Sequence, residues 1–190
     1  MIDLNDEKFD AKKVSIFNDG NAGIVENVTI SIEKKGKEDK ENAPDYKIIC
    51  TDANGSSCNT GIYYPSATEY KDLDKAIADM AKGLKHLITT FGLTPGSYPN
   101  ANAMLDGVMI ELKNAVKGVP VRIIATYGST MGPKEYIQPR SLNWVPWIEL
   151  MSVPKEDSKL VISTSDNLTR KTPDAVSNGT PATANAGSDW

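Results

Sequence analysis

The chain has few of the residues that build metal sites and catalytic centres. It contains two cysteines, Cys50 and Cys58, and one histidine, His86. Two cysteines are too few for a disulfide scaffold, and the chain lacks the further Cys or His pair that a zinc site needs. A Ser or Cys nucleophile would need a histidine partner, and His86 falls in a predicted helix. No glycine-rich phosphate loop or dinucleotide fingerprint is present. We therefore expect a protein that is not an enzyme and uses no metal or cofactor.

Long apolar runs and an excess of positive charge are also missing. No stretch approaches membrane-spanning length, and the acidic segment from Met1 to Glu7 lacks the apolar core of a signal peptide. We expect no membrane partner and a cytoplasmic location. The net charge of −4 excludes a surface covered in positive charge. Any binding of nucleic acid must therefore come from a local basic and aromatic surface.

The apolar residues change their period along the chain. Alternation from Ile24 to Glu33 predicts a half-buried strand, and spacing of three and four residues predicts two amphipathic helices. Asn100 or Asn102 is the expected cap of the second helix. Pro146 indicates an edge or a bulge in the last segment. The predicted strands cover 24–33, 45–51, 57–64, 119–127, 136–138 and part of 142–153, and the predicted helices cover 72–91 and 100–118.

Three strands, a helical insert and two strands follow one another in the order of the OB-fold. This five-stranded barrel commonly binds single-stranded nucleic acid or sugars on its open face. The predicted class is mainly β with an α insert: an OB-like five-stranded barrel with helices between strands 3 and 4. We place this domain at residues 19–160, after an N-terminal extension at 1–18. Almost nothing apolar follows Leu168, so 161–190 is predicted to be a flexible tail.

The two cysteines flank a strong tight-turn signal at Asn54-Gly55. A two-residue turn would set Cys50 opposite Asn59 and direct the two sulfurs to opposite faces of the hairpin. A three-residue turn would set Cys50 opposite Cys58. We expect both to be free thiols in a reducing cytoplasm.

Aromatic and basic side chains gather where an OB-fold binds its ligand. That site is the face around the second and third strands, flanked by the first and fourth hairpin loops. Bases of a single strand stack on aromatic rings, and cations follow the phosphates. The candidate nucleic-acid-binding residues are Lys34, Lys35, Lys37, Tyr46, Lys47, Tyr63, Tyr64, Arg122, Lys134, Arg140 and Trp144. Arg122 and Thr126 share the face of the fourth strand that is opposite its apolar face.

Several of these side chains fit a structural role as well. Tyr46 shares a strand face with Ile48, which also fits a position in the core. Tyr63 and Tyr64 point to opposite faces, so only one of them is expected to be exposed. Trp144 and Trp147 each fit the core as well as the surface. The lysines of the first loop alternate with acidic residues, as in an ordinary solvated loop.

Three segments resemble phage-encoded single-stranded DNA-binding proteins, in particular those of crAss-like phages of gut bacteria. The segments are 23–34, 41–47 and 144–153, within a resemblance that spans 19–159. It implies non-catalytic coating of single-stranded DNA during phage replication or recombination, in the host cytoplasm. Such proteins often end in an acidic tail with a terminal aromatic residue that recruits replication proteins. This chain ends in Asp189-Trp190 but lacks the acidic run, so these two residues are predicted to form either a weak docking peptide or a solubilising extension.

Two other functions use the same fold. One is a protein-interaction or virion-associated structural module that does not bind nucleic acid. The other is an oligosaccharide-binding barrel, which is disfavoured because nothing in the sequence indicates secretion. The lysine-rich first loop and the tyrosines favour DNA, whereas the negative net charge favours the structural module.

Overall fold

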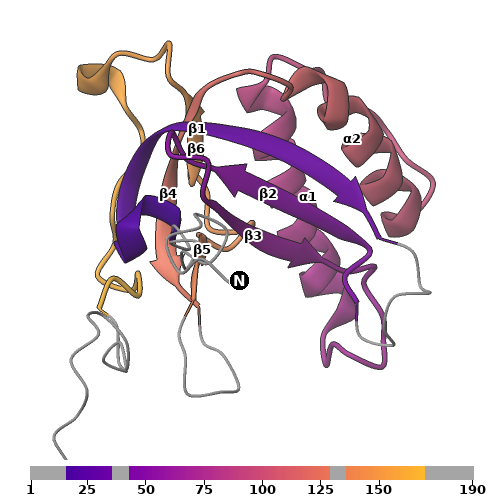
Figure 1. The fold of residues 1–190 in the computed structure, drawn as a ribbon. Coiled ribbons are helices and arrows are strands. Elements are labelled where there is room, and N and C mark those ends of the chain that lie inside the picture. The colour runs from indigo at the N-terminus through magenta and orange to yellow at the C-terminus, as the bar shows by residue number, and fades with distance from the viewer. Residues whose placement is uncertain (1–15, 36–42, 129–135, 170–190) are drawn as a thin grey trace, which may run out of the picture.

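An antiparallel sheet of six strands is the centre of the computed structural model, which describes residues 16–35, 43–128 and 136–169. Two helices follow the third strand, as predicted (Figure 1). Their N-terminal caps are the side chains of Asp72 and Asn100, which accept hydrogen bonds from backbone N–H groups three residues later. The elements are β1 (Gly23–Lys34), β2 (Tyr46–Thr51), β3 (Ser57–Ile62), α1 (Leu73–Thr90), α2 (Ala101–Ala115), β4 (Val121–Tyr127), β5 (Ile137–Pro139) and β6 (Ile148–Leu150).

The strands follow the order β3-β2-β1-β4-β5, and β6 pairs with β4. The two ends of this path, β3 and β5, lie close together, but within the described residues no hydrogen-bonded register joins them. The sheet is therefore not closed. A mainly β fold with two helices between the third and fourth strands is confirmed; the six-stranded open sheet does not confirm a closed five-stranded barrel.

A β-bulge divides β1 into two halves. Val25 pairs with Ile123 and Val28 with Val121, so β1 contains one extra residue between these pairs. Asn27 has a positive φ of 56° there. The first half of β1 pairs with β4 and the second half with β2. Simple alternation from Ile24 is wrong for the first half, because Val25 is buried and Ile24 is 40% exposed.

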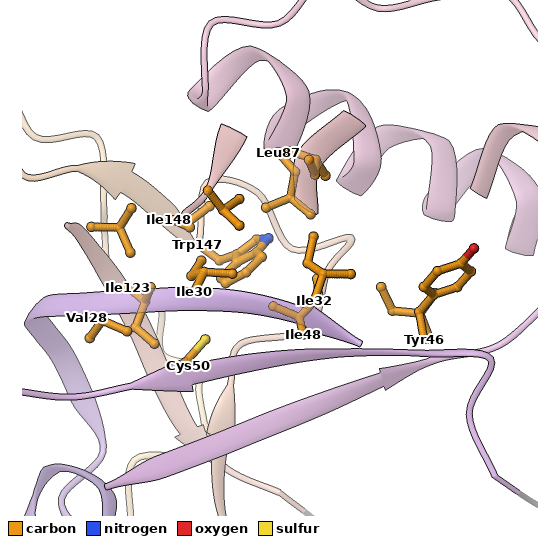
Figure 2. Packing of buried hydrophobic residues seen from close by; sticks show 14 of the residues in the cluster. Val28, Ile30, Ile32, Tyr46, Ile48, Cys50, Leu87, Ile123, Trp147 and Ile148 are labelled. Atoms are coloured by element: carbon orange, nitrogen blue, oxygen red, sulfur yellow. The ribbon is translucent and has the colours of Figure 1, made fainter. Parts of the chain in front are cut away.

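The helices cover one side of β1 and β2, which we call the inner face. It carries Val28, Ile30 and Ile32 of β1 together with Ile48 and Cys50 of β2. Figure 2 shows these side chains packed with Leu87, Trp147 and Ile148. Helix α1 contacts α2 and β6, and α2 contacts β1. Within the described residues, no helix is both long and apolar enough to cross a membrane.

Strand β4 is buried on both faces because the chain returns over it. Residues 121–126 are all buried. Strand β6 pairs with its first half, and the N–H of Tyr127 donates to the carbonyl of Asn167 at 2.8 Å. The side-chain amide of Asn167 also donates to the carbonyl of Tyr127. The predicted start of the tail at 161 is therefore too early, since 161–169 includes residues bonded to the sheet. At the other end, Phe17 of the predicted extension is buried in the core.

The hairpin between β2 and β3 has a three-residue turn, Ala53 to Gly55. The N–H of Asp52 donates to the carbonyl of Ser56 at 2.9 Å, and Gly55 has a φ of 80°. Cys50 therefore lies directly opposite Cys58, which is the second of the two predicted arrangements. Both are buried free thiols.

Candidate nucleic-acid interface

The side of β1, β2 and β3 opposite the inner face is not covered by the helices, and we call it the outer face. Its side chains alternate with the buried ones and are all exposed or half-buried. The register aligns them in three rows across the strands. The rows are Thr29–Thr51–Ser57, Ser31–Ile49–Asn59 and Glu33–Lys47–Gly61. This surface is polar and carries both signs of charge.

Lys47 and Tyr63 bring a cation and an aromatic ring together on the outer face. Lys47 lies between Glu33 and Gly61 in the register. Tyr63 is 42% exposed, and its Cε2 atom would be 3.5 Å from a Cβ atom at Gly61. The same Cβ would be 2.9 Å from Cβ of Pro44, so this close approach requires glycine. An exposed ring beside a lysine is the combination that holds a base and its phosphate.

Three other candidates, Lys34, Tyr46 and Tyr64, converge instead on one carboxylate at the helical side of the sheet. Oδ1 of Asp106 in α2 accepts from the hydroxyl of Tyr64 at 2.6 Å, from Nζ of Lys34 at 3.1 Å and from the hydroxyl of Tyr46. Tyr46 is only 3% exposed. We call these four residues the Asp106 cluster, and it ties α2 to β1, to β2 and to the segment after β3. Tyr46 and Tyr64 therefore contribute hydroxyls to a structural network.

The pKa values in the Asp106 cluster reflect its hydrogen bonds and its burial. The hydroxyls of Tyr46 and Tyr64 hold the pKa of Asp106 below its ordinary value. Burial, together with the neighbouring carboxylate, raises the pKa of Tyr64 to about 12. The hydrogen bond to Asp106 raises the pKa of Lys34. At neutral pH the cluster therefore holds one carboxylate, one ammonium group and two neutral phenols.

Replacing Asp106 with Asn tests the cluster through pH. A carboxylate whose pKa is lowered on folding stabilises the fold above its unfolded pKa, near 3.8, and this contribution is lost as the pH falls through the folded-state value. We expect Asp106→Asn to lower the unfolding free energy by about 1 kcal/mol at pH 7, because the carboxylate is partly exposed. The difference from the wild type should shrink by pH 3. Urea unfolding at both pH values measures this; an equal difference at both would contradict it.

Arg122 and Arg140 are buried, which corrects their prediction as surface cations. Nε of Arg122 is 3.1 Å from Oε1 of Glu26, and its Nη1 donates to Glu149. Arg140 has its Nε 2.8 Å from Oδ1 of Asp166. Thr126, predicted to share a face of β4 with Arg122, is buried as well. Glu149 of the neighbouring strand β6 lies beside Arg122 on the polar face of β4, and the segment after β6 bonds to Glu149 through Ser158 and Lys159.

The two tryptophans differ completely in their exposure to solvent. Trp147 is 0% exposed, whereas Trp144 is 43% exposed. The guanidinium carbon of Arg140 lies 5.6 Å from the centre of the Trp144 ring, which is a cation–π contact. Trp144 keeps an exposed ring, as a binding residue requires.

The remaining candidates lie at the edges of the described chain or outside it. Nζ of Lys35, at the start of the first hairpin loop, is 3.1 Å from Oε2 of Glu33. Lys37, Lys134, Asp189 and Trp190 fall outside the described residues. Of the nine predicted binding residues that the structure describes, Lys47 and Tyr63 lie together on the outer face, and Lys35 reaches the same face through its ion pair with Glu33.

The sequence did not identify two features next to this face. One is Asp106, whose only signal was a carboxylate beside the apolar stripe of a predicted helix. The other is a pocket of about 400 Å³ beside Tyr63, lined by β3, by the first half of α1 and by 141–143. His86 is half-buried, and burial lowers its pKa. Within 16–35, 43–128 and 136–169, no group of three or more His, Cys, Asp or Glu side chains is arranged to hold a metal.

No protein-family model, curated protein or solved structure matches this chain. The resemblance to phage single-stranded DNA-binding proteins therefore stays a prediction, and function is inferred from the outer face itself.

Proposed function

We propose that this protein binds single-stranded DNA on the outer face of β1–β3, without catalysis, and coats it during phage DNA replication or recombination. The observation that supports this most directly is the placement of Lys47 beside Tyr63 on an exposed sheet surface. A ring that can stack on any base, next to a cation, gives affinity with little sequence preference.

The fold supports the proposal because its strand order and the position of its helices agree with those expected of an OB-like fold. The strands run β3-β2-β1-β4-β5, with β3 close to β5, and the helices follow β3. In an OB-fold the ligand lies on the face of strands 2 and 3, between the first loop and the loop joining strands 4 and 5. In the proposed assignment the outer face corresponds to that surface. Its flanking loops contain Lys37 and Lys134, and binding by these two residues stays a prediction.

Replacing Tyr63 and Lys47 tests the proposed face. We expect Tyr63→Ala to weaken binding of a labelled oligothymidylate by roughly fivefold or more, because one stacked base loses its ring. Lys47→Ala should weaken binding at low salt and make the slope of log K against log[salt] shallower by about 0.7, since one phosphate contact is lost. Fluorescence anisotropy at low and high salt measures both effects.

Two controls make this result specific. Tyr63→Phe keeps the ring and should bind nearly as the wild type does. Lys113→Ala removes an exposed lysine of α2, away from the outer face, and should leave the salt slope unchanged. Circular dichroism should report the same helix content for all variants. If folded wild-type protein fails to bind single strands at low salt, the proposed function is wrong.

A structural module without nucleic acid is the second candidate. The net charge of −4 supports it. So does the use of Lys34, Arg122 and Arg140 in ion pairs within the protein. This module, whether it binds proteins or belongs to a virion, would show no salt-dependent affinity for oligonucleotides.

A further inference from the structure

The pocket beside Tyr63 lies where the sheet is left open. Gly61 to Tyr63, at the end of β3, form one wall, and Ser141 to Asn143, just after β5, form another. The first half of α1 contributes a third side. Its volume of about 400 Å³ falls in the range of small-molecule sites, roughly 300–1,000 Å³. Because Tyr63 also stands over Gly61 on the outer face, the pocket and that face are continuous.

The edge of β3 offers backbone hydrogen bonds to this pocket. Asp52 and Ser56 form a hydrogen-bonded pair, and such pairs alternate with non-hydrogen-bonded pairs along an antiparallel ladder. Lys47 and Gly61 are therefore a non-hydrogen-bonded pair, and the N–H and C=O groups of Gly61 point away from β2. Within the described chain these two groups have no other partner. On the opposite wall, the Ser141 hydroxyl donates to Oδ1 of Asn143 at 2.8 Å, which leaves the amide nitrogen of Asn143 as a donor. The pocket therefore presents donors and an acceptor, as the edge of a nucleobase requires.

Two aromatic rings also line the pocket. Tyr63 is 42% exposed and Tyr70 is 41% exposed. Neither hydroxyl takes part in the Asp106 cluster, in contrast to Tyr46 and Tyr64. Exposed rings beside a polar backbone edge suit a flat heteroaromatic group, which can stack and form hydrogen bonds at the same time.

The charges of the pocket select for a neutral group. Asp72 and Asp79 line it together with a single cation, Lys75. The carboxylate of Asp72 already accepts from the N–H of Lys75 as the cap of α1. Two carboxylates against one ammonium group disfavour the entry of a phosphate. The base of a nucleotide fits this lining, and its phosphate does not.

We propose that this pocket takes one nucleobase of the bound strand while the sugar–phosphate backbone stays outside, along the outer face. This inference rests on the proposed function, because it assumes that a single strand follows Lys47 and Tyr63. The inference adds to the outer face a second site, in which one base unstacks from its neighbours and enters the opening between β3 and β5.

The first test removes the ring of Tyr70 or fills the pocket with a larger side chain. Tyr70→Ala should weaken binding of oligothymidylate roughly five- to tenfold, as expected for one lost stacking contact. An abasic strand of equal length should bind the variant and the wild type equally, because it has no base to insert. Ala76→Leu, which fills the pocket from α1 and keeps both rings, should give the same pattern. Ile110→Ala, at an exposed position of α2, is the matched control and should change neither affinity.

The second test uses small probes and does not need a strand. In an NMR titration, thymidine should shift the amide signals of Gly61, Ala76 and Asn143, and deoxyribose 5-phosphate should not. If Tyr70→Ala and Ala76→Leu bind oligothymidylate as the wild type does, while Tyr63→Ala binds it weakly, the pocket is not a base site but the proposed function stands. If the wild type binds no strand at all, the proposed function fails as well.

Discussion

Replacing Trp147 with alanine is expected to lower the free energy of unfolding by about 3–5 kcal/mol. Its side chain is fully buried and packs against Leu87 and Ile148 in the centre of the core (Figure 2). The indole N–H has no hydrogen-bond partner among the described residues, so the loss comes from packing and from the cavity left behind. Urea unfolding followed by far-UV circular dichroism measures it without relying on tryptophan fluorescence.

Trp144 provides a matched control three positions earlier. It is 43% exposed, and its identified contact is the one with Arg140. Trp144→Ala should therefore cost only about 0.5–1 kcal/mol, the value of an exposed cation–π contact. Equal losses for the two variants would show that Trp147 is not the central packing residue that its burial indicates.

The second large effect is expected at Arg122. This guanidinium is only 4% exposed and bonds to Glu26 and Glu149. Arg122→Ala would leave Glu149 charged, 8% exposed and without its cation. Breaking a buried ion pair on one side typically costs about 3–5 kcal/mol, and we expect a loss of that size. Glu26 keeps a second partner in Lys155, so the penalty falls mainly on Glu149.

A double variant tests whether the loss comes from a buried charge without a partner. Arg122→Met combined with Glu149→Gln removes both charges and keeps most of the volume. The single amide oxygen of the glutamine can still accept from the Ser158 hydroxyl, whereas the N–H of Lys159, which bonds to the other carboxylate oxygen, loses its acceptor. We expect this double variant to recover most of the stability lost in Arg122→Ala, because uncharged replacements of similar size are often tolerated. A double variant no more stable than Arg122→Ala would show that the loss does not come from leaving Glu149 charged and unpaired.

The elements that were predicted correctly depend on nearby residues. The cap at Asn100, one of the two positions predicted, acts over three residues, and the stripe of α1 depends on helical spacing alone. The opposite directions of Tyr63 and Tyr64 follow from the geometry of an extended chain, and the structure confirms them. Local rules were sufficient for the order of strands and helices.

The errors arise where distant segments meet. Alternation along β4 indicated an exposed polar face, but the chain after β6 returns to cover it, and Asp166 pairs with Arg140. Tyr46 contacts a carboxylate 60 positions away. No spacing rule reveals such contacts, because they depend on how α2 and the last described segment pack on the sheet. For this reason, the contacts that five of the predicted residues make within the protein were not predicted; these residues are Lys34, Tyr46, Tyr64, Arg122 and Arg140.

The bulge at Asn27 links the number of residues in β1 to the bend of that strand. Because it absorbs one residue, Val25 and Val28 both face inward although they are three positions apart. A chain shortened by one residue at the bulge would keep every downstream side chain on its present side, but β1 would lose its bend. Deletion of Ser31 instead would turn Ile32 towards water and Glu33 towards the interior. The first deletion would straighten β1, and the second would exchange the buried and exposed side chains of β1 after the deletion.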